Sequence, residues 1–392
     1  MTTEGTKRFL VLGAGMMGSA VAYDLAKASP SHTVVLADLN GALAGTVAAA
    51  IGPNVIPRTL DVHDDAALAE LLQGCAVVVS AVSYSVNEAV TRVAIKAGVH
   101  MCDLGGNNDV VDRQMAMDAA ARERNVTVLP NCGLAPGLIN ILAASGVEKF
   151  DAVDAIALRV GGLPRYPRPP LNYQIVFSAE GLLNEYIEPA EILENGELRT
   201  VPSMTGLEEL EFPAPYGKLE AFYTSGGLST LTRTLRGRVK HLDYKTIRYP
   251  GHCERFGMLL DIGFATAEPI MGPGGGVRTS RELFTELLKR KLNGDGPDVV
   301  LARATLRGVK AGRQQTLVYE CVDVYDERTR MTAMMRTTAF PTSVAALLLA
   351  DGTVQRRGVF PPEDCMPGDR MIAELHQRGI VITTQISHES AP

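Results

Sequence analysis

The chain lacks basic clusters and long apolar runs, and both absences exclude broad classes of protein. Its formal net charge is −6, and no segment concentrates Lys and Arg. Nucleic acid, whose phosphates need a basic face, is therefore not expected as a partner. The longest apolar run, Val344 to Ala350, is far too short to span a bilayer. Because no signal-like hydrophobic region precedes the first predicted strand, we expect a cytoplasmic protein that does not enter a membrane.

Cysteine patterning excludes two further classes. The 6 cysteines are scattered, with no C-x-x-C pair and no histidine at zinc-ligand spacing. A disulfide framework and a metal site are therefore not expected. The rest of the composition is ordinary, with 46% hydrophobic and 21% charged residues among 392. A chain of this length usually needs more than one core, so we expect two domains and small-molecule chemistry.

A glycine-rich motif near the N-terminus points to a dinucleotide. The apolar strand that begins at Phe9 runs into a G-x-G-x-x-G pattern that opens an amphipathic helix. The first glycine allows the tight turn, the second lets the backbone approach a pyrophosphate, and the third lets the helix pack on the strand. The helix N-terminus would direct its N–H groups at the phosphates. The expected cofactor contacts here are Gly13, Gly15, Met16, Met17 and Gly18.

Asp38 predicts which dinucleotide is bound. It ends the second predicted strand, 20 residues after Gly18. A carboxylate at this place accepts hydrogen bonds from the ribose 2′-hydroxyl and repels a 2′-phosphate. Leu39 and Asn40, which follow it, supply no cation. We therefore expect NAD in preference to NADP, although a Lys or Arg from a distant loop could still serve a phosphate.

Strand and helix patterns alternate through the first third of the chain, which indicates a Rossmann-type, doubly wound parallel sheet. The predicted strands are Phe9–Leu12, Val34–Asp38, Val55–Leu60, Ala76–Ala81, Val99–Asp103 and Val126–Pro130. A helix at Thr337–Ala350 is expected to pack back onto this sheet. The fold class is thus α/β, with a discontinuous NAD-binding domain at residues 1–135 plus 337–380.

From Asp151 the pattern changes to longer strand-like runs. An Asn195-Gly196 turn predicts a hairpin. We expect a second α+β domain at residues 136–336, for substrate binding and oligomerisation, and disorder at Met1–Thr6 and Ser387–Pro392. The elements predicted for this second domain are strands at Ala155–Val160, Tyr173–Phe177, Val299–Val309 and Gln315–Val324 and helices at Glu254–Phe264 and Ser280–Leu292.

Ligands of such a sheet bind beyond the carboxyl ends of its strands, so the segments that follow the strands hold further candidates. Turn formation and helix capping are the competing roles for all of them. Asp103 is expected to orient the substrate or the nicotinamide. The candidate cofactor contacts are Asp61, Val62, Ala81, Val82 and Gly133, and the candidate substrate contacts are Asn107, Pro136 and Asn140.

Several motifs together resemble the saccharopine dehydrogenase-like family, and most closely its lysine 6-dehydrogenases. Besides the nucleotide fingerprint they are Asp103-Leu104-Gly105-Gly106, Gly133-Leu134-Ala135-Pro136-Gly137, Phe177-Ser178-Ala179-Glu180-Gly181-Leu182, Leu219-Glu220-Ala221-Phe222 and Arg248-Tyr249-Pro250-Gly251-His252. The resemblance implies a split Rossmann domain that carries NAD and a second domain that closes over an amino acid. It also implies oxidation of the ε-amino carbon of lysine, with release of ammonia, to give allysine.

Amine oxidation requires a group that removes a proton. A primary amine with a pKa of about 10.4 is almost wholly protonated at neutral pH, and hydride does not readily leave the carbon of an ammonium. The candidate bases are Asp103, Glu220 and His252. Each of two candidates has an alternative structural role. His252 could instead cap the helix that follows it, and Glu220 could instead be a strand residue in a salt bridge.

An amino-acid substrate also presents an α-carboxylate, which a guanidinium holds well. Arg159 and Arg248 are the candidates, and a surface position is the alternative for both. The resemblance suggests as polar lining residues Asn172, Tyr173, Ser178 and Thr230.

Three functions remain open. The first is NAD-dependent lysine 6-dehydrogenation. The second is a saccharopine-type reductase that joins or splits an amine and a keto acid, for which Arg165 and Arg168 are spare cations. The third is a non-catalytic NAD-binding protein. A homo-oligomer, with a homodimer favoured, is expected in each case.

Overall fold

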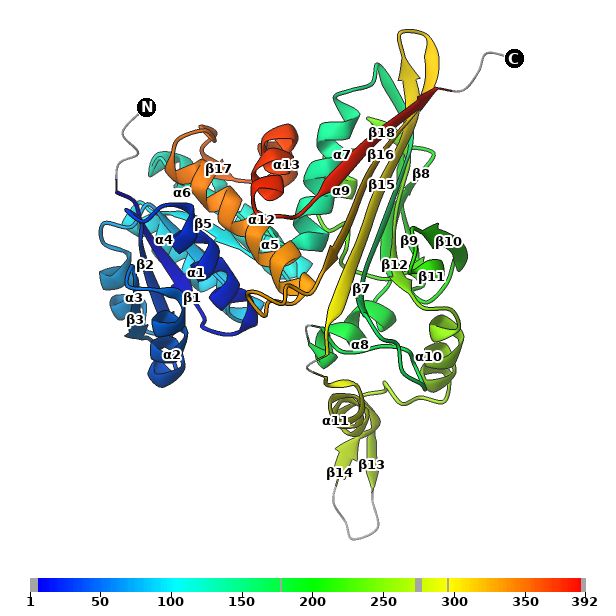
Figure 1. The fold of residues 1–392 in the computed structure, drawn as a ribbon, viewed down its shortest axis with the longest axis horizontal. Coiled ribbons are helices and arrows are strands. Elements are labelled where there is room, and N and C mark those ends of the chain that lie inside the picture. Colours follow the sequence, from blue (N-terminus) through cyan, green and yellow to red (C-terminus); the bar gives the residue numbers. More distant parts are fainter. Residues whose placement is uncertain (1–5, 177, 272–276, 295, 389–392) are drawn as a thin grey trace. The chain divides into compact units, whose positions relative to one another are not determined.

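The computed structural model describes residues 6–176, 178–271, 277–294 and 296–388 (Figure 1). The chain divides into two domains. The first domain comprises Met1–Ser145 and Met335–Val381, and the second comprises Gly146–Met334 and Ile382–Pro392. The first domain thus extends beyond residue 135 to include most of a helix that begins at Ile139. The last segment of the chain, which the sequence left outside both domains, belongs to the second.

The first domain contains a seven-stranded parallel sheet in the order β17-β6-β5-β4-β1-β2-β3. Most of its strands are apolar and buried along their length, as expected for a parallel sheet covered on both faces. The α/β fold class is confirmed. The strands are β1 Arg8–Leu12, β2 Thr33–Asp38, β3 Val55–Thr59, β4 Val77–Ser80, β5 His100–Asp103, β6 Thr127–Leu129 and β17 Gly358–Val359.

The helices of the first domain come from both ends of the chain, and Figure 1 shows the C-terminal α12 and α13 beside N-terminal elements. They are α1 Met16–Ala28, α2 Gly41–Ile51, α3 Asp65–Leu72, α4 Asn87–Ala97, α5 Asn108–Met115, α6 Asp118–Glu123, α7 Ile139–Val147, α12 Ala333–Ala350 and α13 Gly368–Gln377. Three short turns are η1 Tyr84–Val86, η2 Leu134–Leu138 and η3 Pro362–Asp364.

Helix α12 is long and apolar enough, by length and composition alone, to cross a membrane. However, 72% of it is buried inside the protein. Thr337, Thr342 and Ser343 on this helix are completely buried. Thr342 donates to the backbone oxygen of Cys132 at 2.8 Å, and Ser343 also donates, to Asp24. These features are typical of a core helix.

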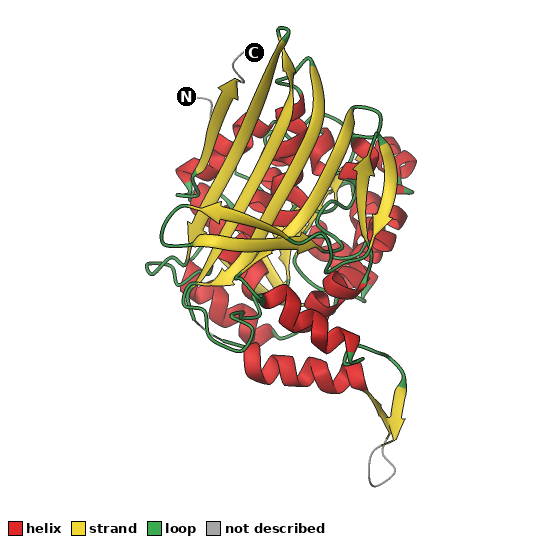
Figure 2. Ribbon diagram, turned by 90° about the vertical axis from the view of Figure 1, so that its right-hand side faces the viewer, coloured by secondary structure: helices red, strands yellow, loops and turns green. Residues whose placement is uncertain are grey.

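The second domain is built on a nine-stranded mixed sheet whose main path is β10-β11-β12-β7-β15-β16-β18 (Figure 2). β12 and β7 pair in parallel, whereas the other pairs are antiparallel. The strands are β7 Ala152–Pro164, β8 Ala190–Glu194, β9 Glu197–Val201, β10 Glu208–Phe212, β11 Gly217–Tyr223, β12 Val239–Arg248, β15 Asp298–Lys310, β16 Arg313–Val324 and β18 Ile382–His388.

Among the described residues of the second domain, the remaining elements are four helices and a small ribbon. The helices are α8 Ala179–Ile187, α9 Leu231–Thr234, α10 His252–Asp261 and α11 Ser280–Leu292, and the ribbon pairs β13 Pro269–Met271 with β14 Val277–Thr279. The predicted hairpin is present, because Asn195 and Gly196 connect β8 to β9 with φ of +53° and +80°.

Two expectations for the second domain are wrong. Tyr173 to Val176 form no strand, and Phe177 lies outside the described residues. Ser387 and His388, expected to be disordered, pair with β16 as part of β18. The other residues expected to be disordered lie outside the described residues, except Thr6, which has no regular structure.

Candidate functional site

The glycine turn after β1 has the geometry that a dinucleotide requires. Gly13 has φ of +96°, and a Cβ there would lie 2.7 Å from the carbonyl oxygen of Ala81. A Cβ on Gly18 would lie 1.9 Å from the carbonyl oxygen of Gly13. Around Gly15, by contrast, nothing lies within 4 Å of an added Cβ. The two outer glycines thus allow close packing of backbone, and the middle one faces open space, as a turn that binds a pyrophosphate requires.

The start of α1 is available for phosphates. Gly15 is its N-cap and supplies no side-chain cap. Met16 is 51% exposed, and Met17 is half-buried beside it. Backbone N–H groups at such a helix start are suited to bind an anion.

Asp38 supports the glycine turn directly. Its Oδ2 accepts from Ala14 N at 2.7 Å, and its Oδ1 accepts from Asn40 N at 2.8 Å. A carboxylate can accept further hydrogen bonds, so these contacts leave capacity for ribose hydroxyls. Asp38 is half-buried at the carboxyl end of β2, as expected for a residue that contacts the ribose.

Two further loops lie at the same edge of the sheet. Ala81 N donates to Leu12 O at 2.8 Å, and Val82 would contact a Cβ on Gly13 at 3.1 Å, so the loop after β4 underlies the glycine turn. Asp61, after β3, is exposed and accepts from His63 Nδ1 at 2.9 Å. Hydrogen bonds from the His63 backbone and side chain lower the pKa of Asp61. Val62 packs against the core of the first domain.

Asp103 has a structural role and is not placed as a base. It is fully buried at the end of β5. Its Oδ1 accepts from Gly105 N at 2.8 Å and Asn131 N at 3.1 Å, and its Oδ2 accepts from Gln114 Nε2 at 2.7 Å. Burial raises the pKa of Asp103, and these hydrogen bonds oppose the shift. The carboxylate thus holds two loops together and does not reach the surface.

The remaining candidates of the first domain are turn and helix residues. Asn107 caps α5 by accepting from Val110 N at 3.1 Å, so Asn107 rather than Asp103 is the cap of this helix. Gly133 and Pro136 belong to the turn before α7, where Gly137 has φ of +130°. Asn140 is fully buried in α7.

The second domain contains a buried arginine at the end of β12. Arg248 is 2% exposed. Its Nε donates to Tyr186 Oη at 2.8 Å, and its Nη1 donates to Ile247 O at 2.8 Å. Its guanidinium lies over the ring of Tyr173, 4.6 Å from the centroid. No carboxylate of the described residues forms an ion pair with it, so the cation is free to bind an anionic group.

His252 orients this cluster and does not act as an exposed base. It is 1% exposed. Its Nδ1 lies 2.9 Å from Leu171 O and its Nε2 lies 3.0 Å from Tyr186 Oη. Burial, followed by the charge of Arg248, lowers the pKa of His252 to about 3. The ring is therefore neutral, donates from Nδ1 to the carbonyl, and accepts the Tyr186 proton at Nε2.

Glu220 also has a role other than the one expected. It is 7% exposed on β11. Its Oε2 accepts from Gly251 N at 2.7 Å and its Oε1 accepts from Cys253 N at 2.6 Å. Glu220 thus caps the N-terminus of α10, where Gly251 has φ of +83°. Its carboxylate is used to hold the turn that follows Arg248.

Arg159 is not available to a substrate carboxylate. It is 8% exposed on β7 and forms ion pairs with Glu208 and, at 2.9 Å, with Asp243. Lys245 pairs with the same Glu208 at 2.6 Å. Arg159 belongs to a charge network of the sheet, so the expectation that it holds the substrate does not fit its surroundings.

Tyr173 lies at the Arg248 cluster, whereas the other predicted lining residues of this domain form turns and caps. Tyr173 is 5% exposed, and its buried hydroxyl has no hydrogen-bond partner. Asn172 adopts φ of +50° in the preceding turn. Ser178 caps α8 by accepting from Gly181 N at 3.2 Å. Thr230 is buried at the start of α9.

Tyr186 of α8 completes the cluster, although it is not among the site residues predicted from the sequence. Tyr186 is 2% exposed and joins Arg248 to His252. Glu185, one position earlier, is half-buried. Tyr186 continues the buried face that Ala179, Leu182 and Leu183 form at helical spacing, and this spacing is the pattern that could have indicated its burial.

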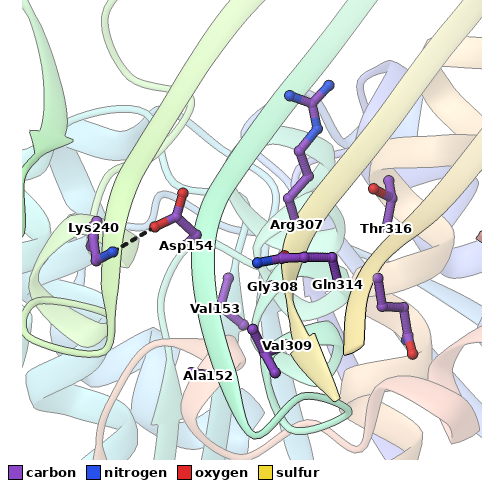
Figure 3. Close-up of a pocket in the computed structure, with 10 residues that line it drawn as sticks. Ala152, Val153, Asp154, Lys240, Arg307, Gly308, Val309, Gln314 and Thr316 are labelled. Atoms are coloured by element: carbon purple, nitrogen blue, oxygen red, sulfur yellow. Dashed lines mark hydrogen bonds and ion pairs between the residues drawn. The ribbon is translucent and has the colours of Figure 1, made fainter. Parts of the chain in front are cut away.

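A hollow elsewhere in the second domain contains none of these residues. It has a volume of about 440 Å³ and is lined by residues of β7, β12, β15 and β16, with Lys240 paired to Asp154 at 2.8 Å (Figure 3). The guanidinium of Arg307 points away from the other labelled side chains (Figure 3). Within the described ranges, no group of three or more His, Cys, Asp or Glu side chains could hold a metal ion.

Two family models cover most of the chain. The model described as the saccharopine dehydrogenase NADP binding domain matches residues 9–129. The model described as the saccharopine dehydrogenase C-terminal domain matches residues 133–380. The first match includes the glycine turn of the first domain, and the second includes the Arg248 cluster of the second domain.

Curated relatives and a solved structure agree with this match. The chain is 22% identical to the mitochondrial alpha-aminoadipic semialdehyde synthase of Rattus norvegicus, over 97% of this chain and 48% of that protein, so it spans about half of that relative's length. It is 23% identical to the saccharopine dehydrogenase [NADP(+), L-glutamate-forming] of Schizosaccharomyces pombe, over 86% of this chain and 90% of that protein. The apo L-Glu-forming saccharopine dehydrogenase of Saccharomyces cerevisiae has the same fold, with a TM-score of 0.80 and 20% identity over 97% of this chain and 100% of that one.

Proposed function

Because the chain belongs to the saccharopine dehydrogenase family, whose members are NAD(P)-dependent oxidoreductases, we propose that it oxidises the C–N bond of a secondary amine built from an amino acid and a keto acid. The observation that carries this proposal is Arg248, a buried guanidinium without a carboxylate partner among the described residues. A buried, unpaired cation is unfavourable unless a ligand neutralises it. An amino-acid carboxylate is the matching group.

The residues of the chain act mainly by binding and orienting. Tyr186 and His252 fix the Arg248 guanidinium, whose remaining N–H groups would bind the carboxylate. The turn after β1 would hold the dinucleotide, whose nicotinamide accepts the hydride that leaves the carbon next to nitrogen. Water then adds to the resulting imine, and the C–N bond breaks to give an aldehyde and an amine.

The proton of the reacting amine has to leave before the hydride does. Asp103, Glu220 and His252 are each held by backbone or side-chain hydrogen bonds inside one domain. We propose that none of them removes this proton and that it passes to water. Activity should therefore rise as the pH approaches the pKa of the amine itself.

Lysine 6-dehydrogenation is the second candidate, and one observation favours it. Arg159, the other expected carboxylate ligand, is neutralised by Glu208 and Asp243. A substrate with a single carboxylate needs only Arg248. A substrate with more carboxylates needs further cations, for which the exposed Arg165 and Arg168 are available.

An activity assay separates these candidates. The purified chain is mixed with NAD or NADP and with saccharopine, lysine or ornithine at alkaline pH, and reduced nicotinamide is followed by absorbance. Reduction with saccharopine that releases an amino acid supports the main proposal. Reduction with lysine that releases one ammonia per turnover supports the second. Dinucleotide binding without turnover of any of these amines would contradict both and leave the non-catalytic alternative.

We also propose NAD as the preferred dinucleotide, on the basis of the Asp38 carboxylate at the end of β2. Asp38→Asn removes the charge and retains one acceptor oxygen. Affinity for NADP relative to NAD should rise about tenfold, a change of about 1.4 kcal/mol. Fluorescence titration with both reduced dinucleotides measures this ratio, and an unchanged ratio would rule out the role of Asp38.

A further inference from the structure

Two helices and the small ribbon of the second domain expose an unusually large apolar surface. We refer to α10, β13, β14 and α11 together as the arm. Of the 19 large hydrophobic residues that are exposed in the described ranges, eight lie in or between these elements, from Met258 to Leu287. Exposed apolar side chains that are scattered singly are ordinary, whereas a concentration of them marks an interaction surface.

The elements of the arm are tied to one another, so their side chains belong to one substructure. Phe264, just after α10, packs against Phe284 of α11 with ring centroids 5.4 Å apart. Arg281 N donates to Thr266 O at 3.1 Å. Strand β14 leads directly into α11, because its last residue, Thr279, is the cap of that helix. Figures 1 and 2 show the ribbon and α11 together at one end of the second domain.

Helix α10 has a second apolar stripe besides the face that it buries. Phe256 is fully buried and lies against Phe284, with ring centroids 5.8 Å apart. Met258 and Ile262 lie one turn apart on the opposite side of the helix, at about 100° per residue. They are 56% and 65% exposed. The core of the second domain therefore leaves this stripe uncovered.

Helix α11 repeats the pattern. Its buried face includes Thr285 and Leu292. Leu283 and Leu287, again one turn apart, lie on the other side and are 44% and 54% exposed. A helix with apolar residues on both sides is normally covered on both sides. The outer stripes of α10 and α11 thus indicate a partner.

The ribbon also lacks a covering layer. Its strands have three residues each, and every residue except Thr279 is exposed. Met271 and Val277 lie opposite each other across the two strands and are 78% and 61% exposed. An isolated pair of short strands is marginally stable in water, and it gains stability when its apolar side chains are packed.

The size of this apolar surface fits a standard protein–protein interface. A surface on the order of 600 Å² is offered by Met258, Ile262, Met271, Val277, Leu283 and Leu287. This area is at the upper end of the range for single patches on monomers. In an interface that is about 60% apolar it corresponds to roughly 1,000 Å² per partner, which is enough for a stable dimer.

The charges of the arm favour a second copy of this chain as the partner. From Glu254 to Arg290 the sequence has acidic and basic residues in equal number, so two arms do not repel each other through net charge. A membrane surface, which attracts segments with an excess of Lys and Arg, fits less well. A contact about a two-fold axis places the same patch on both sides of the interface, and an apolar patch is complementary to itself.

We propose that the chain forms a homodimer through the arm, in which the outer stripes of α10 and α11 and the ribbon of one copy pack against those of the other. The inner side of α10 meets the Arg248 cluster, because Phe256 stacks on His252 with ring centroids 5.6 Å apart. The dimer contact thus supports this helix from its outer side. The inference is independent of the proposed function, because self-association is measured without substrate or dinucleotide.

Met258→Glu and Leu287→Glu test the two helices of the arm separately. Each substitution enters a two-fold interface twice, so it buries two charges without partners. The dissociation constant of the dimer should rise at least about thirtyfold in each variant, as for a residue at the centre of an interface. Sedimentation equilibrium over a range of protein concentrations measures it. Glutamate is a good helix former, so both variants should fold, and far-UV circular dichroism checks this.

Ile386→Glu is the matched control. Ile386 is 54% exposed, as Leu287 is, but it lies on β18. This variant should remain a dimer with the dissociation constant of the wild type. A wild type that is monomeric at every concentration would overturn the proposal and leave a different protein as the partner of the arm. Dimers of unchanged affinity in both arm variants would also overturn it, because another face would then form the interface.

Hydrogen exchange of the wild type tests the ribbon without any substitution. The backbone N–H groups of β13 and β14 should exchange more slowly at protein concentrations well above the dissociation constant than at concentrations well below it. The N–H groups of β8 and β9, a hairpin elsewhere in the second domain, should exchange at the same rate under both conditions. Equal rates for the ribbon at all concentrations would contradict its place in the interface.

Discussion

Gly15 and Gly18 stand in the same turn but in opposite surroundings. An added Cβ on Gly18 would overlap the carbonyl oxygen of Gly13, whereas one on Gly15 would meet no atom within 4 Å. Gly15→Ala should therefore fold normally yet place a methyl group where the pyrophosphate approaches. We expect its affinity for reduced dinucleotide to fall at least tenfold, measured by fluorescence titration, at unchanged thermal stability.

Gly45→Ala is the matched control for that variant. Gly45 lies on α2, and an added Cβ there also meets nothing within 4 Å. It should change neither folding nor dinucleotide affinity. Normal binding by Gly15→Ala would show that the turn is not the pyrophosphate site.

At the residue scale, the sequence predicts the role of a residue when that role depends on its neighbours along the chain. It does not predict the role when the hydrogen-bond partners come from distant segments. The glycine pattern is local, because Gly13, Gly15 and Gly18 define their turn within six residues. The roles of Glu220 and His252 depend on partners that come from other segments, such as Leu171 O for the histidine. The sequence shows that a carboxylate or imidazole is present. It does not show whether backbone groups from a distant segment will use its hydrogen-bonding capacity in the folded protein.

At the element scale, Glu220 illustrates how one strand positions the next helix. Its two oxygens hold Gly251 N and Cys253 N at the start of α10. Glu220→Ala should destabilise the protein by about 2–4 kcal/mol, because two charge-assisted hydrogen bonds disappear and the N–H groups of Gly251 and the buried Cys253 lose their acceptor. Urea unfolding measures the change.

Glu209→Ala provides the comparison for this capping role. Glu209 lies opposite Glu220 in the register of the antiparallel strands β10 and β11, but Glu209 is exposed. Its removal should change the free energy of unfolding by less than about 0.5 kcal/mol. Equal losses for the two variants would show that the cap contributes nothing specific.

Element boundaries were predictable where the pattern and the packing agree. Helix α11 covers Ser280–Leu292 as predicted, with a capping box at Thr279 and Glu282. The apolar run at Tyr173 fails as a strand because Tyr173 packs in a helix-rich core with residues of α8, α10 and α11. Alternation of apolar residues indicates burial there, but it does not show which kind of element buries them.

At the scale of the whole molecule, buried titratable groups make stability depend on pH in opposite directions. Burial lowers the pKa of His100 to about 4 and that of His252 to about 3. The unfolded chain therefore binds protons that the folded one does not, and stability falls as pH drops below about 6.5. Burial raises the pKa of Glu185 to about 7, so this residue binds its proton more tightly in the folded state. Its contribution to the free energy of unfolding therefore falls as the pH rises from about 4.5 to 7.

Substitution separates these effects. In His252→Gln the decline in unfolding free energy between pH 6.5 and 4.5 should be shallower than in the wild type, by up to about 1.4 kcal/mol per pH unit. In Glu185→Gln the decline should be steeper over the same range, because the opposing contribution is gone. Urea midpoints at four pH values give these slopes, and parallel slopes for all three proteins would contradict the assignments.

The interrupted order of the first domain has a consequence for how the protein is made. Strands β1 to β6 of its sheet and its early helices lie in the segment up to Ser145, whereas most of α12, and all of β17 and α13, belong to the segment that begins at Met335. At about 5–20 residues per second, a ribosome needs roughly 10–40 s to add the intervening second domain. During that time the nascent first domain lacks the helix whose Thr342 meets the backbone of Cys132. The domain that carries the glycine turn is therefore begun first and completed late, and the surface that α12 covers in the finished protein stays exposed in the meantime.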